Sequence, residues 1–258
     1  MRLAAFSDIH GNLIALEAIL ADLAAVSDVE MIWCLGDLAA FGSRPLECVR
    51  RIKALSEQDE GKKFRVIGGN TDRYLIGGER MRVAAAQEES EFLKLATELQ
   101  NRDTVTNWSL GQLDFEAYQY LKSILRRELT KDVDGYGIVI GYHAVPGDDE
   151  AFLTAATPDE LTADYFLDRE GRLGIGGHIH RQFDRQIDDW RIVNIGAVGM
   201  SFDQPGKAQY AIFTFADGDV DVELRNIPYD TDAAIADLRE AGHPNPNWFI
   251  SKLRPAGA

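Results

Sequence analysis

Cysteine, proline and long apolar runs are scarce in this sequence of 258 residues, which has two cysteines and eight prolines. Cys34 and Cys48 form no CxxC pattern, and Cys34 lies in the apolar run MIWCLG, so we expect inert thiols and a reducing compartment. The first apolar residues are interrupted at Asp8, too early for the core of a signal peptide, and no run reaches the length that spans a membrane. We therefore expect a cytoplasmic protein that does not associate with membranes.

Positive charge is also in short supply. The chain has 27 Lys and Arg residues against 42 Asp and Glu, which gives a formal net charge of −15 at pH 7. Because such a surface repels polyanions, we expect no stable binding to nucleic acid. The densest basic clusters, at 50–53 and 126–127, fall on segments with helical spacing and are interpreted as solvated faces. A phosphate bound by this chain therefore needs a local positive charge, which a metal ion would supply.

The sequence does contain enough hydrophobic residues to form a sizeable core. Hydrophobic residues make up 45% of the chain, which predicts a globular protein with an ample core. We expect one domain over residues 1–242, and the Pro, Asn and Gly residues after 242 predict a loose tail over 243–258. The expected strands cover 2–6, 30–35, 64–67, 137–142, 173–175, 192–195, 209–215 and 220–224. The expected helices cover 12–26, 45–55, 79–99, 112–129, 158–167 and 230–240, with a polar connection through Trp108 and a hairpin turn at 188–189.

Polar residues follow the ends of several predicted strands. They occur in SDIHGN, LGD, GGNTD, GYHAVPGD and GGHIH, and the set is Asp8, His10, Asp37, Asn70, His143, His178 and His180. Each alone has an ordinary explanation as a helix cap, a turn residue or a hydrogen-bonded histidine. Together they hold four of the five histidines, and ligands of layered α/β folds collect at the carboxyl ends of strands. The i, i+2 spacing of His178 and His180 predicts an extended backbone at a strand end.

These seven side chains have coherent ligand chemistry. Carboxylate and amide oxygens with imidazole nitrogens, and no thiolate, favour Mn, Fe, Zn, Ni or Co. Seven donors exceed what one ion can use while keeping a position open for water, whereas two ions sharing a carboxylate would use them all. Such a pair of ions clamps a phosphoryl oxygen and acidifies a bridging water for in-line attack. The sequence therefore predicts a binuclear centre that acts on a small phosphate ester or a nucleotide.

The order of motifs D-x-H, GD, GN-x-D, H and G-H-x-H across about residues 1–200 resembles the calcineurin-like metallophosphoesterase superfamily. The segment NIGAVGMS at 194–201 resembles the small prokaryotic, phosphodiesterase-type branch of that superfamily. The resemblance implies an α/β fold of four layers, an α/β/β/α sandwich in which two mixed β-sheets pack face to face between helices. It also implies hydrolysis of phosphodiesters or phosphomonoesters and two divalent metal ions, with manganese the first expectation.

The resemblance also implies which ligands would hold each of the two ions. The first ion would be held by Asp8, His10 and His180, the second by Asn70, His143 and His178, with Asp37 bridging the two. Asp37, Asn70 and His178 would act in catalysis through the ions and the bridging hydroxide. Asp72 resembles an acid that orients a ligand from behind, with a helix cap as the alternative interpretation. Arg73 and Tyr74, which follow Asn70, are candidates for substrate contacts, although a surface arginine that pairs with its neighbours is an equal alternative.

The chain departs from the family pattern at Thr71, where many members have a histidine that is thought to protonate the leaving alkoxide. A threonine hydroxyl cannot act as a general acid at neutral pH, so we expect a preference for activated esters such as aryl phosphates, or an acid from elsewhere. A scaffold role in protein binding is the alternative function, which the complete ligand set disfavours. The physiological substrate, the metal and the oligomeric state stay open, and His243 is assigned no role.

Overall fold

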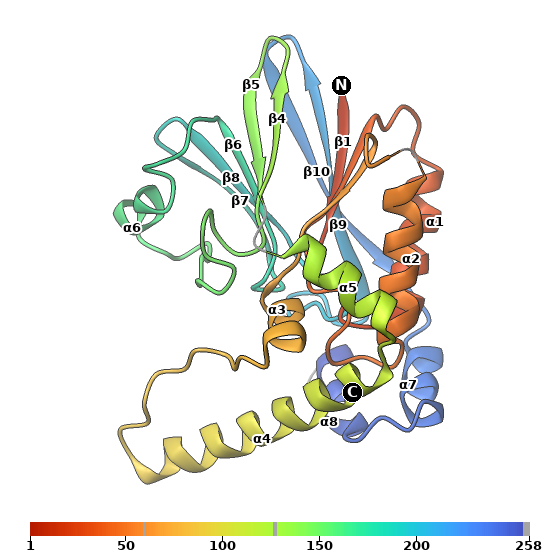
Figure 1. Cartoon of the computed structure of the whole chain (residues 1–258). Helices are drawn as coiled ribbons and strands as arrows, with labels where there is room; N and C mark the ends of the chain where they lie inside the picture. The colour runs from red at the N-terminus through yellow and green to blue at the C-terminus, as the bar shows by residue number, and fades with distance from the viewer. Residues whose placement is uncertain (59, 126–127, 255–258) are drawn as a thin grey trace.

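The fold is built around two mixed β-sheets, as the family resemblance implies, and each sheet has five strands (Figure 1). The computed structural model describes residues 1–58, 60–125 and 128–254. The first sheet has the order β10-β9-β1-β2-β3, with β1 at Arg2–Phe6, β2 at Met31–Cys34, β3 at Phe64–Val66, β9 at Lys207–Ala216 and β10 at Asp219–Pro228. The second has the order β4-β5-β6-β8-β7, with β4 at Leu129–Val133, β5 at Gly137–Gly141, β6 at Leu173–Gly176, β7 at Gln182–Ile187 and β8 at Trp190–Ile195.

Strand β1 shows why the sheets form layers. Successive side chains of a strand point to opposite faces, and every residue from Leu3 to Phe6 is buried. Leu3 and Ala5 join the core between the two sheets, where they meet residues such as Trp33 and Val193, while Ala4 and Phe6 join the core under the helices. A central strand that is buried on both faces therefore reads as the continuous apolar run found in the sequence.

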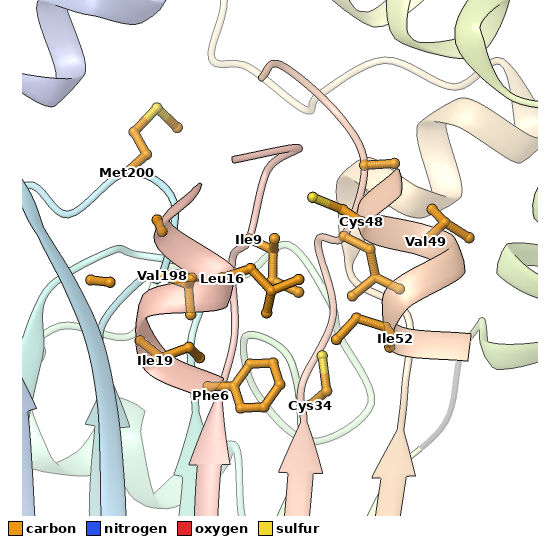
Figure 2. Packing of buried hydrophobic residues seen from close by; sticks show 14 of the residues in the cluster. Phe6, Ile9, Leu16, Ile19, Cys34, Cys48, Val49, Ile52, Val198 and Met200 are labelled. Carbon is orange, nitrogen blue, oxygen red and sulfur yellow. The ribbon is translucent and has the colours of Figure 1, made fainter. Parts of the chain in front are cut away.

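Helices α1 (Leu13–Ala24), α2 (Pro45–Glu57) and α5 (Phe115–Ile124) lie beside the outer face of the first sheet (Figure 1). Figure 2 shows Leu16 of α1 above Phe6 of β1, and Ile52 of α2 beside Cys34 of β2. Both cysteines lie in this core as free thiols, Cys34 on β2 and Cys48 on α2. Burial raises the pKa of each thiol well above its ordinary value, which fits the inert role expected from the sequence.

The fourth layer is thin. On the outer face of the second sheet the described residues place only helix α6 (Asp159–Asp164) and its flanking loops, over a core that includes Tyr142, Phe166 and Ile192. Helices α3 (Asn70–Gly77), α4 (Glu89–Gln112), α7 (Thr231–Glu240) and α8 (Pro246–Leu253) gather at the end of the sheets away from the N-terminus (Figure 1). The four-layer expectation is confirmed, with helices concentrated on one side and at one end.

Several element boundaries differ from the expectations. The helix predicted over 79–99 begins at 89 and continues to 112, so Trp108 is helical and does not lie in a connection. The helix predicted over 112–129 covers only 115–124. Strand β4 and helix α3 were not predicted. The basic pair at 126–127, which was expected to lie on a helix, is outside the described residues.

The loose tail predicted over 243–258 is wrong for residues 246–253, which form α8 with Phe249 and Leu253 buried in the core. Asn245 caps this helix by accepting the Trp248 backbone N–H at 3.2 Å, and Pro246 occupies its first turn. The last four residues, 255–258, lie outside the described part of the chain. Among residues 1–58, 60–125 and 128–254, no helix has the length and apolar character needed to cross a bilayer.

Candidate metal centre

The seven predicted ligands come together at the carboxyl ends of five strands. Asp8 and His10 follow β1, Asp37 follows β2, Asn70 follows β3, His143 follows β5, and His178 and His180 follow β6. Backbone hydrogen bonds tie these loops to one another. The Asp8 N–H donates to the Gly36 carbonyl at 3.0 Å, the His10 N–H to the Asp37 carbonyl at 2.9 Å, and the Gly177 N–H to the His143 carbonyl at 2.8 Å. The chain therefore holds the ligands through main-chain contacts between distant segments.

The ligand loops have unusual backbone conformations. Five of the seven ligands have positive φ angles: Asp8, His10, Asp37, His178 and His180. Non-glycine residues seldom adopt this left-handed region, and such strain persists where surrounding structure imposes it, often at functional sites. The expected extended backbone at GGHIH is wrong, because His178 and His180 have φ angles of 71° and 57°. Their strand-end position is as predicted, and a bend turns the two rings in different directions.

A first group of donors consists of Asp8, His10 and His180. The His180 Nε2 lies 3.2 Å from Asp8 Oδ1, and the His10 Nε2 lies 3.7 Å from the same oxygen. The two Nε2 atoms are 3.0 Å apart. All three side chains are buried, and one atom of each lies within 4.8 Å of the others, which is close enough to share one metal ion.

A second group surrounds Asn70 and lies next to the first. The Asn70 Oδ1 is 2.9 Å from His143 Nε2 and 3.1 Å from His178 Nδ1. Asp37 Oδ2 is 3.5 Å from His143 Nε2 and 3.6 Å from His10 Nε2. One carboxylate oxygen of Asp37 thus faces a histidine of each group. His178 and His180, two positions apart in the chain, contribute to different groups.

Backbone carbonyls fix the orientation of three rings. The Nδ1 atoms of His10, His143 and His180 lie 3.2, 2.7 and 2.7 Å from the carbonyl oxygens of Ala40, Leu35 and Met200. A neutral ring that donates from Nδ1 presents a lone pair at Nε2, the tautomer that metal-binding histidines use. When His10 and His180 are both neutral in this tautomer, their Nε2 lone pairs face each other across 3.0 Å, and a metal ion or a proton between them relieves the repulsion.

The ionisation states of His10, His178 and the two carboxylates suit metal binding, whereas His143 must lose a proton to bind a metal ion. Burial lowers the pKa of both His10 and His178 to about 4, so both rings are neutral at pH 7. Burial alone would raise the pKa of Asp8, but His180 outweighs it and the value falls to about 2. Burial opposes the ionisation of Asp37 too, and the neighbouring His143 lowers its pKa nonetheless. His143 has the reciprocal shift, since Asp37 overcomes the effect of burial and raises the pKa of His143 to about 10.

Unpartnered polar atoms gather at the same place. Buried atoms without a hydrogen-bond partner among the described residues include Thr71 Oγ1 and His178 Nε2, and Asp8 Oδ1 has only its contacts with the rings of His10 and His180. Burying a polar group without a partner costs free energy, so such atoms call for an explanation. Two of them belong to the predicted ligands. The donor set, its burial and these orphaned atoms together fit divalent cations at this site.

Asp72 ties two of the ligand loops together. Its carboxylate accepts the backbone N–H groups of Asp37 at 2.8 Å, of Leu38 at 3.0 Å and of Gly69 at 3.0 Å. The Gly69 bond caps the start of α3, and the other two hold the loop that carries Asp37. Burial and the nearby Asp37 charge raise the pKa of Asp72 to about 7.

Glycines allow the close approach of these loops. A Cβ atom at Gly177 would lie 2.4 Å from Asp8 Oδ2, and one at Gly69 would lie 2.2 Å from Asp37 Oδ1. Only glycine leaves room for the carboxylate at both positions. Gly177 of GGHIH and Gly69 of GGN are therefore explained by the lack of space for a side chain at these two positions.

The two candidate substrate contacts are engaged within the protein. Arg73 donates to Asp149 at 2.7 Å and to Glu150 at 3.0 Å, pairs with Glu79, and has a side chain that is 11% exposed. This is the alternative interpretation of an arginine that pairs with its neighbours. Tyr74 is buried. Arg73 and Tyr74 are both residues of α3. Arg73 lines a cavity of about 560 Å³ whose lining also includes His143.

Aromatic side chains around the ligands were missed by the sequence reasoning. Phe41 stacks on His10 with ring centroids 5.1 Å apart, Phe202 stacks on His180 at 4.6 Å, and Phe152 meets His178 edge-on at 5.2 Å. Phe202 directly follows the NIGAVGMS segment, which was a usable signal. Phe152 lies nine positions after His143 in a loop with no motif, and nothing in the sequence marks it.

The fold and the site define a metal-binding α/β protein of the phosphoesterase type. The chain belongs to the calcineurin-like phosphoesterase superfamily, whose domain model matches residues 1–218. It is similar to an uncharacterized protein of Methanocaldococcus jannaschii, with 26% identity over 97% of this chain and 96% of that protein. It is also similar to a symmetrical bis(5′-nucleosyl)-tetraphosphatase of Chromohalobacter salexigens, with 31% identity over 40% of this chain and 36% of that protein.

Solved structures agree with this assignment. A metallophosphoesterase from Sphaerobacter thermophilus has 27% identity and a TM-score of 0.72, with 98% of both chains covered. A hypothetical protein from Pyrococcus horikoshii has the same fold, with 19% identity and a TM-score of 0.77 over 99% of this chain and 98% of that one. The family and fold predicted from the motifs are confirmed.

Proposed function

We propose that this protein hydrolyses small phosphate esters with two divalent metal ions held by the seven ligands. Asp8, His10 and His180 would hold one ion, and Asn70, His143 and His178 the other, with Asp37 shared. The observation that carries the proposal is the pair of His10 and His180 Nε2 atoms, 3.0 Å apart with both Nδ1 atoms committed to carbonyls. Manganese is the first candidate, and iron, nickel, zinc or cobalt would suit the same donors.

The chain contributes charge and orientation. When bound, the ions neutralise phosphoryl oxygens and lower the pKa of a water, which supplies the nucleophile. The ionised carboxylates of Asp8 and Asp37 set the charge of the site, and carbonyls hold the histidine rings so that their donor atoms converge. A phosphate can then bind despite the acidic surface, whose formal net charge is −15.

Thr71 bears on the choice of substrate. Its side chain is buried beside the second group, and its N–H donates to Asp37 Oδ1 at 2.9 Å. Its hydroxyl cannot protonate a leaving alkoxide at neutral pH, so esters with good leaving groups are favoured. The similarity to bis(5′-nucleosyl)-tetraphosphatases over 40% of the chain supports nucleotide-type substrates. A cytoplasmic location belongs to the same proposal, and the two free, buried cysteines support it.

The test compares metal content with turnover. Protein purified without chelator is analysed for metals and assayed on bis(p-nitrophenyl) phosphate and on p-nitrophenyl phosphate. We expect about two ions per chain, turnover that EDTA abolishes, and recovery with Mn²⁺, Ni²⁺ or Co²⁺. The rate should fall steeply along a series of diesters as the leaving group becomes less acidic, and equal rates on aryl and alkyl diesters would reject the role given to Thr71.

A metal-loaded chain that hydrolyses none of these esters would overturn the proposed activity and favour the scaffold alternative. His178→Ala is the matched variant, because its ring belongs to the second group only. It should lose turnover while it retains the folded circular dichroism spectrum.

A further inference from the structure

Two exposed phenylalanines flank the metal centre on separate loops. Phe152 is 63% exposed and lies in the loop after His143, whereas Phe202 is 40% exposed and lies in the loop after β8. Each touches a histidine of a different ligand group, Phe152 touching His178 and Phe202 touching His180. Large apolar side chains that face water beside a charged centre have no role in the core of the fold.

Phe202 is held in a defined position. Its ring stacks on His180 with centroids 4.6 Å apart and an interplanar angle of 29°, and its N–H donates to the His180 carbonyl at 2.9 Å. The adjacent Asp203 accepts the Ser201 hydroxyl and the Gln182 N–H, each at 2.9 Å. One face of the ring lies on His180, so its exposed area belongs to the opposite face and the edge. The ring is thus a preorganised flat surface next to the first ligand group.

Phe152 is held from both sides along the chain. Glu150, two residues before it, is buried and accepts bonds from Arg73 and Arg82, and Leu153, directly after it, is buried in the core of the second sheet. Its ring meets His178 edge-to-face at an interplanar angle of 63° and a distance of 5.2 Å. A short loop anchored at both ends thus projects one aromatic side chain beside the second ligand group.

We infer that Phe202 and Phe152 bind a planar aromatic group of the substrate while its phosphate lies at the metal centre. Aromatic side chains stack on any flat π-system, and a nucleobase or an aryl ester provides one. The face of Phe202 would stack on this group, with Phe152 forming a second wall. The inference rests on the proposed function and deepens it, because it selects nucleotide or aryl phosphates over sugar or alkyl phosphates.

Binding to the full chain loaded with Mn²⁺ tests the inference, and inorganic phosphate is measured after each titration so that any turnover is separated from binding. Calorimetric titrations compare AMP, phenyl phosphate and ribose 5-phosphate, which share a monoester but differ in the ring. We expect at least one of the two ring-bearing ligands to bind about tenfold more tightly than ribose 5-phosphate, in line with stacking energies. AMP and phenyl phosphate separate the two sources of the ring. Preference for AMP alone assigns a nucleobase, and preference for phenyl phosphate alone assigns an aryl ester.

Leucine variants remove the rings and keep apolar bulk. In Phe202→Leu the advantage of the ring-bearing ligand should fall to about twofold, and in Phe152→Leu it should fall less. Phe115→Leu is the matched control, since Phe115 is 75% exposed on α5 and stacks only on Tyr118 among the described aromatic contacts. Metal content and thermal unfolding verify that each variant is intact.

Equal affinities of the three ligands for the wild type overturn the inference, and so does an advantage that survives in the Phe152→Leu/Phe202→Leu double variant. A protein that binds AMP selectively but hydrolyses no ester supports the inference and overturns the proposed activity. Hydrolysis of p-nitrophenyl esters without any ring preference in binding supports the proposed activity and overturns the inference.

Discussion

His243 donates its Nε2 hydrogen to the Phe41 carbonyl at 2.7 Å, and the Phe41 ring stacks on His10, a predicted metal ligand. The sequence suggested no role for His243, the one histidine outside the ligand set. The carbonyl of Ala40, next to Phe41, accepts the Nδ1 hydrogen of His10. His243 thus anchors, from the C-terminal part of the chain, the loop that orients His10.

This contact predicts a pH dependence of stability. Burial lowers the pKa of His243 below 6.5, and its Nδ1 accepts the Asn245 N–H, which also requires the neutral ring. The unfolded chain therefore takes up the proton first, and the free energy of unfolding falls as the pH drops below about 6.5. In His243→Gln this fall should be smaller. Urea unfolding of both proteins at pH 7.5 and pH 5.0 measures it, and identical pH dependences would contradict the neutral buried ring.

The shared position of Asp37 predicts a severe effect of a small change. Asp37→Asn keeps the shape but removes the charge that faces both His10 and His143. Because the loss of groups that merely support a ligand already costs about 10- to 100-fold, we expect kcat/KM to fall by about 100-fold or more, with lower metal content. Asp149→Asn, which alters an ion pair of Arg73, is the control and should keep most activity. Near wild-type turnover in Asp37→Asn would remove the bridging role.

Gly177→Ala should damage the site by steric conflict. The new Cβ would lie 2.4 Å from Asp8 Oδ2 and 2.6 Å from Ser7 Oγ, so the Asp8 loop must move. We expect a loss of about 1–3 kcal/mol in the free energy of unfolding, together with weaker metal binding. Gly111→Ala is the control: Gly111 is in α4, no atom lies within 4 Å of its added Cβ, and a gain of about 0.5–1 kcal/mol is expected. Denaturation curves and metal titrations report both quantities.

Removal of the metal should destabilise the fold. Without cations, the Nε2 atoms of His10 and His180 lie 3.0 Å apart and the carboxylates of Asp8 and Asp37 are buried in one place, and bound cations would stabilise both arrangements. At a free Mn²⁺ concentration 100 times the dissociation constant, linkage gives about 2.7 kcal/mol per site. We expect EDTA to lower Tm by about 5 °C or more. His10→Ala should respond less to EDTA, and an unchanged Tm in the wild type would argue against any tightly bound ion.

The convergence of the seven proposed ligands could be predicted because its signal is local and repeated. A short apolar strand followed by Asp, His or Asn can be recognised without knowing the partner segments, and strand ends meet at one edge in an α/β fold. The conformations of the ligands could not be predicted. The positive φ angles of Asp8 and Asp37 are imposed by bonds to distant residues such as Gly199 and Asp72, which no local pattern reveals.

The helices show where periodicity is insufficient. Residues 100–111 are mostly polar and bury only Val105 and Ser109 within α4, so their helical face carries too few apolar positions to stand out. Residues 79–88 have apolar spacing yet form no helix before 89. In contrast, α8 had a readable start, because Asn245 and Pro246 form a standard N-terminal cap. The contact of Phe152 with His178 has no signal in the sequence, whereas the contact of Phe202 with His180 follows the NIGAVGMS segment.

The cross-bonded, left-handed loops have a consequence for how this centre can arise. Asp8 is fixed by backbone bonds to Gly36, which follows it in the chain, and to Gly199 in the C-terminal half, and His178 is fixed by a backbone bond to the Asp8 carboxylate. No fragment shorter than residues 8–199 contains all of these partners, so short excised peptides would carry the same side chains without their arrangement. We therefore expect the site to bind cations only when all of these segments are folded together. The time at which cation binding appears during refolding would then show when the last segment docks.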